Sequence, residues 1–399
     1  MNDILFLAHR IPFPPDRGDK IRSFNILKHL STLATMHLAC FADDEADAAH
    51  LAGLRDTLGG RLGEAHVEVR RTSRAAAGAR ALLSGKPLSL TLFDSGAMRG
   101  FVQRVLAQSD IATVFAFSSQ MAQFVPAGAR LVMDFVDMDS AKFEAYAAQG
   151  GPLASVYRRE GRRLFAFERE TAARAEVSLF VSEAEAALFA ERADLPQGDI
   201  RALHNGVDLD FYRPGAVSPA GAPKRPLIVF TGQMDYAPNA DAVTWFAQQV
   251  LPQVPGAHFA IVGRNPSDAV KRLASERVTV TGEVPDTRFW LEAADVVAAP
   301  LRIARGVQNK VLEAMAMARP VVATPAAFEG IEAQPGRDLL VADSAEEQAR
   351  AIRHLLSDPA RAAALGAAAR RRVEEVYSWE ARLAPLAALV GLPRRKAAA

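Results

Sequence analysis

Short apolar runs alternate with longer stretches in which apolar residues recur at helical spacing, along the whole chain. In the first half the runs predict strands at residues 4–8, 36–41, 114–117, 131–135 and 177–181. In the second half they predict strands at residues 227–231, 258–262, 278–281, 296–299, 321–324 and 339–341. Such alternation is typical of βαβ units around a parallel sheet. The pattern therefore predicts two doubly wound α/β domains.

Proline and glycine are concentrated between the two halves, in residues 208–226. This composition is typical of a linker. We therefore expect an N-terminal domain at 1–207 and a C-terminal domain at 227–377. In the final segment, 378–399, a helical pattern runs to Leu389 and a basic, alanine-rich tail follows, which we expect to fray.

Composition narrows the classes of function. The chain has 399 residues, of which 50% are hydrophobic, enough for two proper cores. Its formal net charge of +1 argues against a nucleic-acid partner held by a global positive field. The single cysteine, Cys40, excludes an intramolecular disulfide and fits a cytoplasmic, reducing compartment, where we expect it to be a small core residue. The first apolar run is too short for a signal peptide, and none approaches the roughly 18 apolar residues that span a bilayer. Any membrane contact is therefore expected to be peripheral.

Residues 305–324 carry the most informative pattern. They place Gly306, Lys310 and Glu313 on or just before one short helix between two strands. The apolar residues Val311, Leu312 and Met315 form one stripe of that helix, and Pro320 is expected to stop it.

The start of a helix that follows a parallel strand lies at the carboxyl edge of the sheet, where its N–H groups and dipole attract phosphate. Lys310 would add a positive charge there. Glu313 shares its face, and its two oxygens can accept both hydroxyls of a ribose. The plainer alternative is an i,i+3 ion pair on an ordinary surface helix.

Further glycines and polar residues follow other predicted strands. Gly18 lies in the loop at 14–20, Gly232 and Asn239 lie in the segment 230–239, and Gly263 is followed by Arg264. Taken singly, a glycine at the end of a strand is more often required by a turn than by a ligand.

Together these motifs resemble the retaining GT-B glycosyltransferases of the group 1 (family 4) type. The closest resemblance is to the sugar transferases of PEP-CTERM/exosortase exopolysaccharide clusters. It covers nearly the whole chain and is strongest from residue 230 to 330. It implies two Rossmann-like domains facing a central cleft, the C-terminal one binding a nucleotide diphosphate sugar and the N-terminal one binding a saccharide acceptor, lipid-linked in such clusters. It also implies that a last helix around Trp379, in the segment 378–399, crosses back to the N-terminal domain. The implied reaction is transfer of a hexosyl unit with retention, with no metal and no other cofactor.

The resemblance also assigns roles to individual residues. Glu313 matches the glutamate that holds the donor ribose. Arg264 and Lys310 match the basic positions that neutralise the diphosphate, which makes them the catalytic candidates. The remaining donor-binding candidates are Gly232, Asn239, Gly263, Gly306 and Val307, and Gly18 matches a glycine loop that faces the donor from the N-terminal domain.

Two positions depart from the family pattern. Arg305 stands eight residues before Glu313, in place of a first glutamate that normally touches the sugar. The basic residue expected downstream of Gly232 is absent, and Lys310 would compensate for its charge.

On the acceptor side the candidates are His9, Gly18, Asp137 and Asp139. Asp137-Met138-Asp139 has the form of a metal-binding DxD motif, but it lies in the half opposite the donor domain, so we assign no metal to it. It contacts the acceptor or, alternatively, forms a capped turn before a helix at Lys142. His9 contacts the acceptor or is a polar residue at the edge of the sheet.

Two basic runs suggest docking to a membrane. The first comprises Arg70, Arg71 and Arg74 with Arg80 and Lys86, and the second spans 158–169. The second is interleaved with Glu160, Glu168 and Glu170, so i,i+4 pairing explains it better. The first run is therefore the favoured candidate for contact with anionic lipid.

Two rival functions remain open. One is a nucleotide-sugar 2-epimerase on the same fold, which needs acid–base carboxylates that the sequence does not locate. The other is a non-catalytic subunit of a polysaccharide assembly complex, since a fold does not guarantee chemistry.

Overall fold

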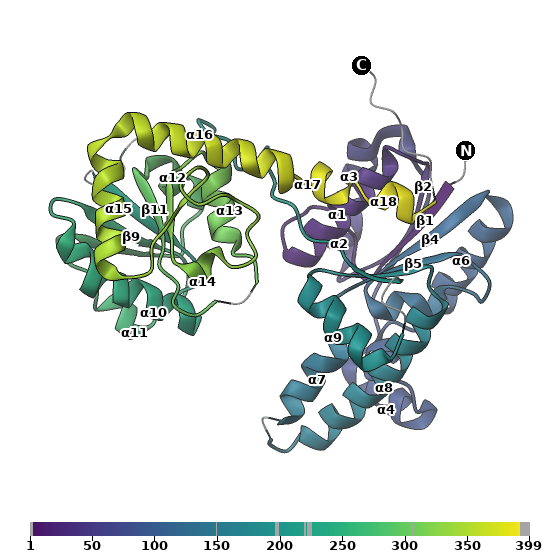
Figure 1. The fold of residues 1–399 in the computed structure, drawn as a ribbon. Helices are drawn as coiled ribbons and strands as arrows, with labels where there is room; N and C mark the ends of the chain where they lie inside the picture. The colour runs from purple at the N-terminus through teal and green to yellow at the C-terminus, as the bar shows by residue number, and fades with distance from the viewer. Residues whose placement is uncertain are drawn as a thin grey trace. The chain divides into compact units, whose positions relative to one another are not determined.

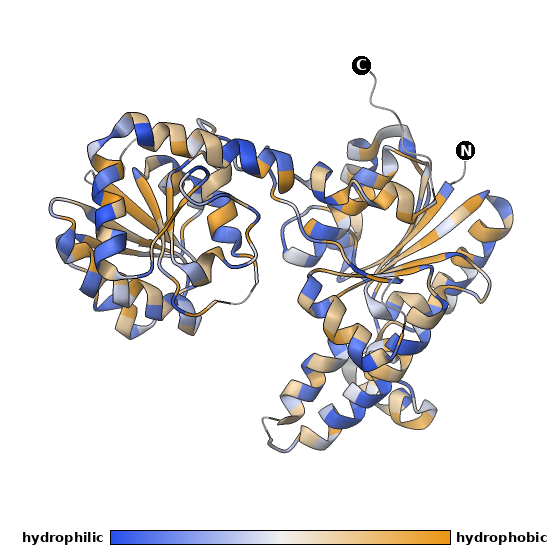
Figure 2. Cartoon of the chain, viewed as in Figure 1, coloured by the Kyte–Doolittle hydropathy of each residue, from blue (hydrophilic) through white to orange (hydrophobic). Residues whose placement is uncertain are grey.

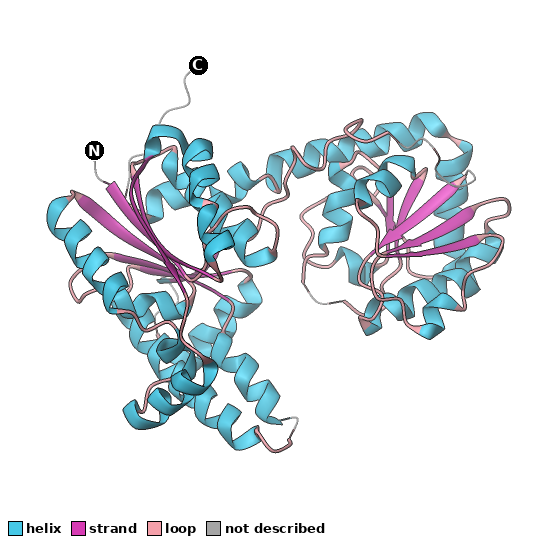
Figure 3. Ribbon diagram, turned by 180° about the vertical axis from the view of Figure 1, so that it is seen from behind, coloured by secondary structure: helices cyan, strands magenta, loops and turns pink. Residues whose placement is uncertain are grey.

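The computed structural model describes residues 3–148, 150–195, 199–218, 221, 226–304 and 306–391. The chain divides into two compact units, Met1–Asn205 with Leu383–Ala399, and Gly206–Arg382. In each unit a parallel sheet has helices on both faces (Figure 1, Figure 3). The prediction of two doubly wound Rossmann-like domains is confirmed.

The sheet of the first unit has seven strands in the order β3-β2-β1-β4-β5-β6-β7. The strands are β1 (Asp3–Ala8), β2 (Met36–Ala42), β3 (Leu62–Val69), β4 (Ile111–Phe117), β5 (Leu131–Val136), β6 (Val177–Phe180) and β7 (Ile200–Ala202). The helices of this unit are α1 (Gly18–Ser31), α2 (Glu45–Ala49), α3 (Leu51–Leu58), α4 (Arg74–Ser84), α5 (Leu88–Leu92), α6 (Gly96–Gln108), α7 (Asp139–Ala148), α8 (Ala154–Arg174), α9 (Glu183–Ala193) and α18 (Leu386–Leu389).

Two of these strands were not predicted. The edge strand β3 alternates apolar with polar residues and only its first residue is buried, so it has no continuous apolar run. The strand β7 has only three residues. The prediction depended on continuous apolar runs. The edge strand β3 has no such run, and β7 is too short to show one.

The sheet of the second unit has six strands in the order β10-β9-β8-β11-β12-β13. All were predicted to within a residue or so: β8 (Leu227–Thr231), β9 (His258–Val262), β10 (Val278–Gly282), β11 (Val296–Ala299), β12 (Val321–Ala323) and β13 (Leu340–Val341). The helices are α10 (Ala237–Trp245), α11 (Asp268–Lys271), α12 (Thr287–Ala293), α13 (Asn309–Ala316), α14 (Pro325–Phe328), α15 (Ala345–Ser357), α16 (Pro359–Val376) and α17 (Trp379–Leu383).

Burial follows the apolar pattern in both units. Strands β1, β2, β8 and β9 are almost wholly buried, while most helices present one apolar and one polar side (Figure 2). Cys40 is fully buried in β2, as its assignment to the core predicted. Because every described strand pair is parallel, the carboxyl ends of the strands in each sheet meet at one edge, which is where open α/β sheets bind ligands.

The end of α13 differs from the prediction. The helix stops at Ala316, before Pro320 is reached. Ala318 has a φ of 52°, and its N–H donates to the carbonyl of Met315. A left-handed residue therefore ends the helix, and Pro320 only follows it.

The described part of the expected linker is anchored to the second unit. Arg370 of α16 donates hydrogen bonds to the carbonyl oxygens of Tyr212 and Leu209. Residues 219–220 and 222–225 lie outside the described part of the chain. At the other end, Thr113 of β4 donates to the carbonyl of Val390, so the segment after α18 packs on the first unit. The basic tail at 392–399 lies outside the described residues.

Each of the described helices is too short or too polar to cross a bilayer.

A buried ion pair lies inside the first unit. Arg22 of α1 and Asp134 of β5 are 1% and 0% exposed. The guanidinium donates to both carboxylate oxygens, from Nε at 2.9 Å and from Nη2 at 3.1 Å. Its Nη1 donates to the carbonyl of Leu203 and to Asn205 Oδ1. Arg22 thus ties together α1, β5 and the end of this unit's main segment.

Candidate functional site

A cavity of about 440 Å³ opens at the carboxyl edge of the second unit's sheet. It lies where β8, β9 and β10 end and where α13 begins. Its walls are formed by Tyr212, Thr231, Gly232, Gln233, Asn239, Val262, Gly263, Arg264, Glu283, Val284, Thr287, Asn309, Lys310 and Glu313. Six candidates that are far apart in the sequence therefore meet in one place: Gly232, Asn239, Gly263, Arg264, Lys310 and Glu313.

The floor of the cavity requires two glycines. Gly263 has a φ of 150°, and a Cβ there would collide with the carbonyl oxygen of Gly232. At Gly232 a Cβ would lie 2.8 Å from Asn239 Nδ2 and 3.3 Å from Lys310 Nζ. The turns after β8 and β9 therefore touch each other at Gly232 and Gly263. Because neither residue has a side chain, a ligand in the cavity can approach their backbone closely.

Lys310 is held in the cavity by polar and aromatic contacts. Its Nζ donates to Asn239 Oδ1 at 2.5 Å and lies 4.6 Å from the centre of the Phe230 ring. Asn239 in turn donates to the carbonyl of Gln233 at 2.9 Å, which fixes its orientation. Burial lowers the pKa of Lys310 to about 8, and the charge of Glu313 only partly opposes this. A partly desolvated ammonium of this kind gains more from an anionic ligand than an exposed one does.

Glu313 interacts with the hydroxyl of Tyr212, which favours its carboxylate form. Burial raises its pKa, against the opposing effects of Tyr212 and Lys310. Burial also raises the pKa of Tyr212, so its phenol stays protonated and acts as a donor. The plainer interpretation as a surface ion pair is wrong, because Lys310 and Glu313 each have another partner and both face the cavity.

Arg264 is exposed and stands at the rim of the cavity, where its Nη2 donates to Gln233 Oε1 at 3.2 Å. The next residue, Asn265, has a φ of 55° and donates to Asp235. Arg264 and Asn265 thus both contact the loop that follows Gly232, through Gln233 and Asp235.

Gly306 and Val307 precede α13 and are not among the residues that line the cavity. The side chain of Gln308, at the cap position of α13, donates to the carbonyl of Gly306, and no side chain caps the N–H groups of the helix. The start of α13, with Asn309 and Lys310 in the cavity wall, is thus the part of this segment that faces a ligand. Arg305 lies outside the described residues.

Several wall residues were not predicted from the sequence. Tyr212 lies in the segment expected to be a linker, and Thr287 follows the helix cap Asp286. Thr231 ends β8, and its buried Oγ1 has no hydrogen-bond partner among the described residues. A hydroxyl at the end of a strand carries weak sequence signal, although Thr231 directly precedes Gly232.

Replacing Gly232 with alanine should weaken binding of a nucleoside diphosphate by roughly tenfold without unfolding the protein. The added methyl would displace Asn239 Nδ2 and Lys310 Nζ, which are ends of side chains and can yield. Calorimetric titration would measure the affinity, and thermal unfolding would check the fold. Gly263→Ala is the contrasting variant, because its methyl meets backbone and should lower the unfolding temperature. Unchanged affinity in Gly232→Ala would contradict this role.

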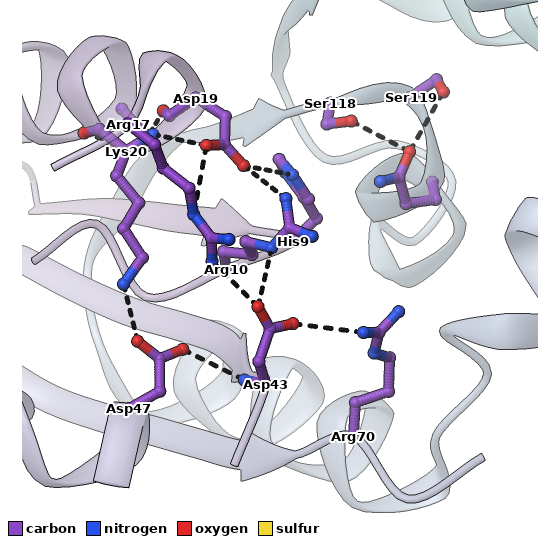
Figure 4. A network of polar contacts seen from close by, with 12 residues as sticks. His9, Arg10, Arg17, Asp19, Lys20, Asp43, Asp47, Arg70, Ser118 and Ser119 are labelled. Carbon is purple, nitrogen blue, oxygen red and sulfur yellow. Dashed lines mark hydrogen bonds and ion pairs between the residues drawn. The ribbon is translucent and has the colours of Figure 1, made fainter. Parts of the chain in front are cut away.

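In the first unit, His9 and Gly18 lie at the carboxyl edge of the sheet. His9 Nε2 is 3.2 Å from Asp19 Oδ2 (Figure 4). The His9 ring stacks on Phe117 with centroids 5.8 Å apart. Gly18 begins α1, and the space around it is open. His9 is thus held from two sides.

Three arginines beside His9 converge on one carboxylate. Arg10, Arg17 and Arg70 each place a nitrogen within 3.3 Å of Asp43 (Figure 4). They hold the pKa of Asp43 below its usual range, although burial opposes them. Most of the basic charge at this edge is therefore engaged within the protein.

Asp137 and Asp139 both pair with Lys142, at 2.9 and 3.1 Å. The N–H groups at the start of α7 are satisfied by other carboxylates, since Met138 N donates to Glu185 and Ser140 N donates to Glu168. The carboxylates of the DxD motif are thus bound to a cation of the chain itself.

Comparison with known proteins gives one family match. Residues 225–358 match the model of the family described as Glycosyl transferases group 1. This range contains every cavity residue except Tyr212.

Two curated relatives extend further. The lipopolysaccharide core biosynthesis mannosyltransferase LpcC of Rhizobium leguminosarum is 29% identical over 196 residues, which is 45% of this chain and 55% of that protein. The GDP-mannose-dependent alpha-(1-6)-phosphatidylinositol monomannoside mannosyltransferase of Mycobacterium tuberculosis is 29% identical over 310 residues, which is 72% of this chain and 77% of that protein.

Among solved structures, HepE of Anabaena in complex with UDP superposes with a TM-score of 0.63. The match covers 97% of this chain and 99% of that one at 16% identity, so it shows the fold alone.

Proposed function

We propose that this protein is a group 1 glycosyltransferase that moves a hexosyl unit from a nucleotide diphosphate sugar to a saccharide acceptor, with retention and without a metal. The acceptor is lipid-linked and the product is an exopolysaccharide, as for the sugar transferases of PEP-CTERM/exosortase clusters. The observation that carries the proposal is the cavity in which a buried ammonium, a glycine-lined backbone and a carboxylate held by a phenol meet.

The chemistry assigned to the cavity is stabilisation of a leaving diphosphate. Lys310 and Arg264 supply positive charge, and the uncapped N–H groups of α13 point the same way. Gly232 and Gly263 let the diphosphate approach the backbone. Glu313, oriented by Tyr212, accepts the two hydroxyls of the ribose.

The acceptor is proposed to bind at the carboxyl edge of the first unit's sheet, near His9 and Gly18, with Asp137 and Asp139 at the end of β5. The two curated relatives support a saccharide attached to a lipid, since one is a mannosyltransferase of lipopolysaccharide core biosynthesis and the other is a phosphatidylinositol monomannoside mannosyltransferase.

The epimerase alternative requires carboxylates free to move protons. The cavity walls contain two, Glu283 and Glu313, and Glu313 is engaged by Tyr212. This favours transfer over epimerisation. A non-catalytic subunit is the remaining rival.

The first experiment is a calorimetric titration of UDP, GDP and ADP against the wild type and Glu313→Ala. We expect one nucleotide to bind and the variant to lose about 10- to 100-fold in affinity, because charge-assisted hydrogen bonds to the ribose are worth roughly 1.5–3 kcal/mol. Glu276→Ala, at an exposed glutamate of the same unit, is the matched control and should bind as the wild type does.

A second measurement follows the fate of the cognate nucleotide sugar. Transfer to a saccharide acceptor, or slow hydrolysis without one, supports the proposal. Accumulation of an epimerised donor would establish the epimerase instead. A protein that binds none of the three nucleotides would be a non-catalytic subunit.

A further inference from the structure

The arginine-rich helix α8 buries two of its three glutamates, Glu160 and Glu168, whereas Glu170 is exposed. Glu160 is 3% exposed and accepts a hydrogen bond from the N–H of Ser89. Glu168 is fully buried and accepts from the Oγ and the N–H of Ser140. The predicted i,i+4 pairing is therefore confirmed only in part: Glu168 bonds to Ser140, Glu160 bonds to Ser89 and lies 3.9 Å from its neighbour Arg159, and Glu170 interacts electrostatically with Arg174.

The arginines of α8 are consequently left on its outer side. Arg158, Arg162 and Arg163 are exposed, and no hydrogen bond or ion pair to their side chains is found within the described part of the chain. Arg159 differs, since it donates to the carbonyl of Ala81 at 2.8 Å. The outer side of α8 thus carries three uncompensated positive charges within six residues.

Beside this charge, the last turn of α4 exposes two leucines. Leu82 and Leu83 are 73% and 90% exposed, whereas Ala77 and Ala81 on the opposite side of the helix are buried. Gly85 then ends the helix in a left-handed conformation. Within the described part of the first unit, these two adjacent leucines are therefore left largely uncovered.

Helices α4 and α8 are fixed to each other. Arg159 bonds to α4, and Ser89 of α5 bonds to Glu160. Lys86 and Arg163 line one cavity of about 560 Å³ between the two elements, together with one acidic residue, Glu170. In Figure 1 and Figure 3, α4, α7 and α8 lie together at one end of the first unit.

The tip of the α7–α8 hairpin adds apolar area at the same end. Leu153 and Val156 are each 52% exposed and lie shortly before Arg158 in the chain. Apolar side chains thus flank the basic stretch on both sides.

We propose that this end of the first unit, called the α4–α8 surface and made of Leu82, Leu83, Lys86, Leu153, Val156, Arg158, Arg162 and Arg163, docks on an anionic phospholipid bilayer. The leucines and Val156 enter the interfacial layer, while the basic side chains contact lipid phosphates. The interfacial layer of an anionic bilayer binds surfaces that combine exposed aliphatic side chains with an excess of positive charge.

The same composition argues against a second copy of the chain as the occupant. A symmetric pairing would bring the arginines of both copies together, and like charges in a contact are costly. Of the first basic run, Lys86 belongs to this surface, whereas Arg70 pairs with Asp43 and Arg71 with Glu45.

Co-sedimentation of the full chain with vesicles tests the surface. The probes are vesicles of phosphatidylcholine alone and vesicles with an equal part of phosphatidylglycerol. We expect binding to the anionic vesicles only, with about a 100-fold loss in Arg158→Gln/Arg162→Gln/Arg163→Gln, since each basic residue near a surface contributes about fivefold. Leu82→Ser/Leu83→Ser should lose roughly tenfold or more.

Matched controls carry the same changes on exposed positions of the second unit. Arg350→Gln/Arg361→Gln/Arg371→Gln and Ile303→Ser should bind vesicles as the wild type does. Equal losses in these controls, or no loss in the α4–α8 variants, would overturn the proposal. So would a dimer in sedimentation velocity that Leu82→Ser/Leu83→Ser dissolves, since a second copy would then cover the surface. Nucleotide binding is measured on every variant, so failure of the donor site and failure of this surface are told apart.

Discussion

Replacing Lys310 with alanine should lower the rate of glycosyl transfer by about 10²–10³-fold, the largest effect expected from any single side chain of the donor site. The ammonium stands against Asn239 and the Phe230 ring, above the glycine-lined floor. Charge grows on the diphosphate as the sugar leaves, so a cation held in a partly desolvated place stabilises the transition state more than the bound donor. We therefore expect the fall in kcat to exceed the loss in nucleotide affinity.

The pH dependence sharpens this prediction. The pKa of Lys310 is lowered to about 8 by burial, so in the free protein the ammonium loses its proton within an accessible range. The protonated form binds the diphosphate. Affinity for the nucleoside diphosphate should therefore be full at pH 7 and fall as the pH rises through about 8. Calorimetric titration between these limits would measure it.

Two variants separate charge from position. Lys310→Arg keeps a cation that stays protonated, so its affinity should no longer fall in this range. Lys271→Ala removes an exposed lysine that pairs with Asp268 in α11 and should change neither kcat nor the pH profile. A Lys310→Ala protein that transfers sugar at the wild-type rate would remove Lys310 from the mechanism.

Much of the donor cavity was predictable because its parts carry local signals. A glycine directly after a buried strand, as at Gly232 and Gly263, and a helix with Lys310 and Glu313 on one side are visible in a short window of sequence. That these parts meet follows from parallel topology alone, since all the carboxyl ends share one edge.

The sequence did not predict the role of Tyr212 or the orientation of the α8 glutamates, and the reason is the same in both cases. Tyr212 reaches the cavity because the segment before β8 folds back on α16, which a proline-rich composition does not suggest. The glutamates of α8 look alike in sequence whether they face solvent or the protein, and only the contacts of Ser89 and Ser140 decide it. Local pattern predicts elements, while the direction in which a charged side chain points depends on tertiary partners.

The largest loss of stability is expected from Asp134→Ala, which should cost about 3–5 kcal/mol of unfolding free energy. The substitution leaves the guanidinium of Arg22 buried with only neutral partners, Leu203 O and Asn205 Oδ1. It also removes the acceptor of the Val136 N–H. Thermal and denaturant unfolding would measure the loss. Glu45→Ala is the control, because its ion pair with Arg71 is exposed and should contribute almost nothing.

A double substitution separates two contributions to the free energy of unfolding: the cost of leaving Arg22 buried without Asp134, and the net stabilisation by the ion pair itself. Desolvating both ions is expensive, so a buried pair often stabilises no more than apolar side chains of similar volume. Arg22→Met/Asp134→Leu should therefore be clearly more stable than Asp134→Ala, although it lacks both charges. If the double variant is as unstable as the single one, the hydrogen bonds from Arg22 to Leu203 and Asn205 hold the first unit together, and the charge of Asp134 is secondary to them.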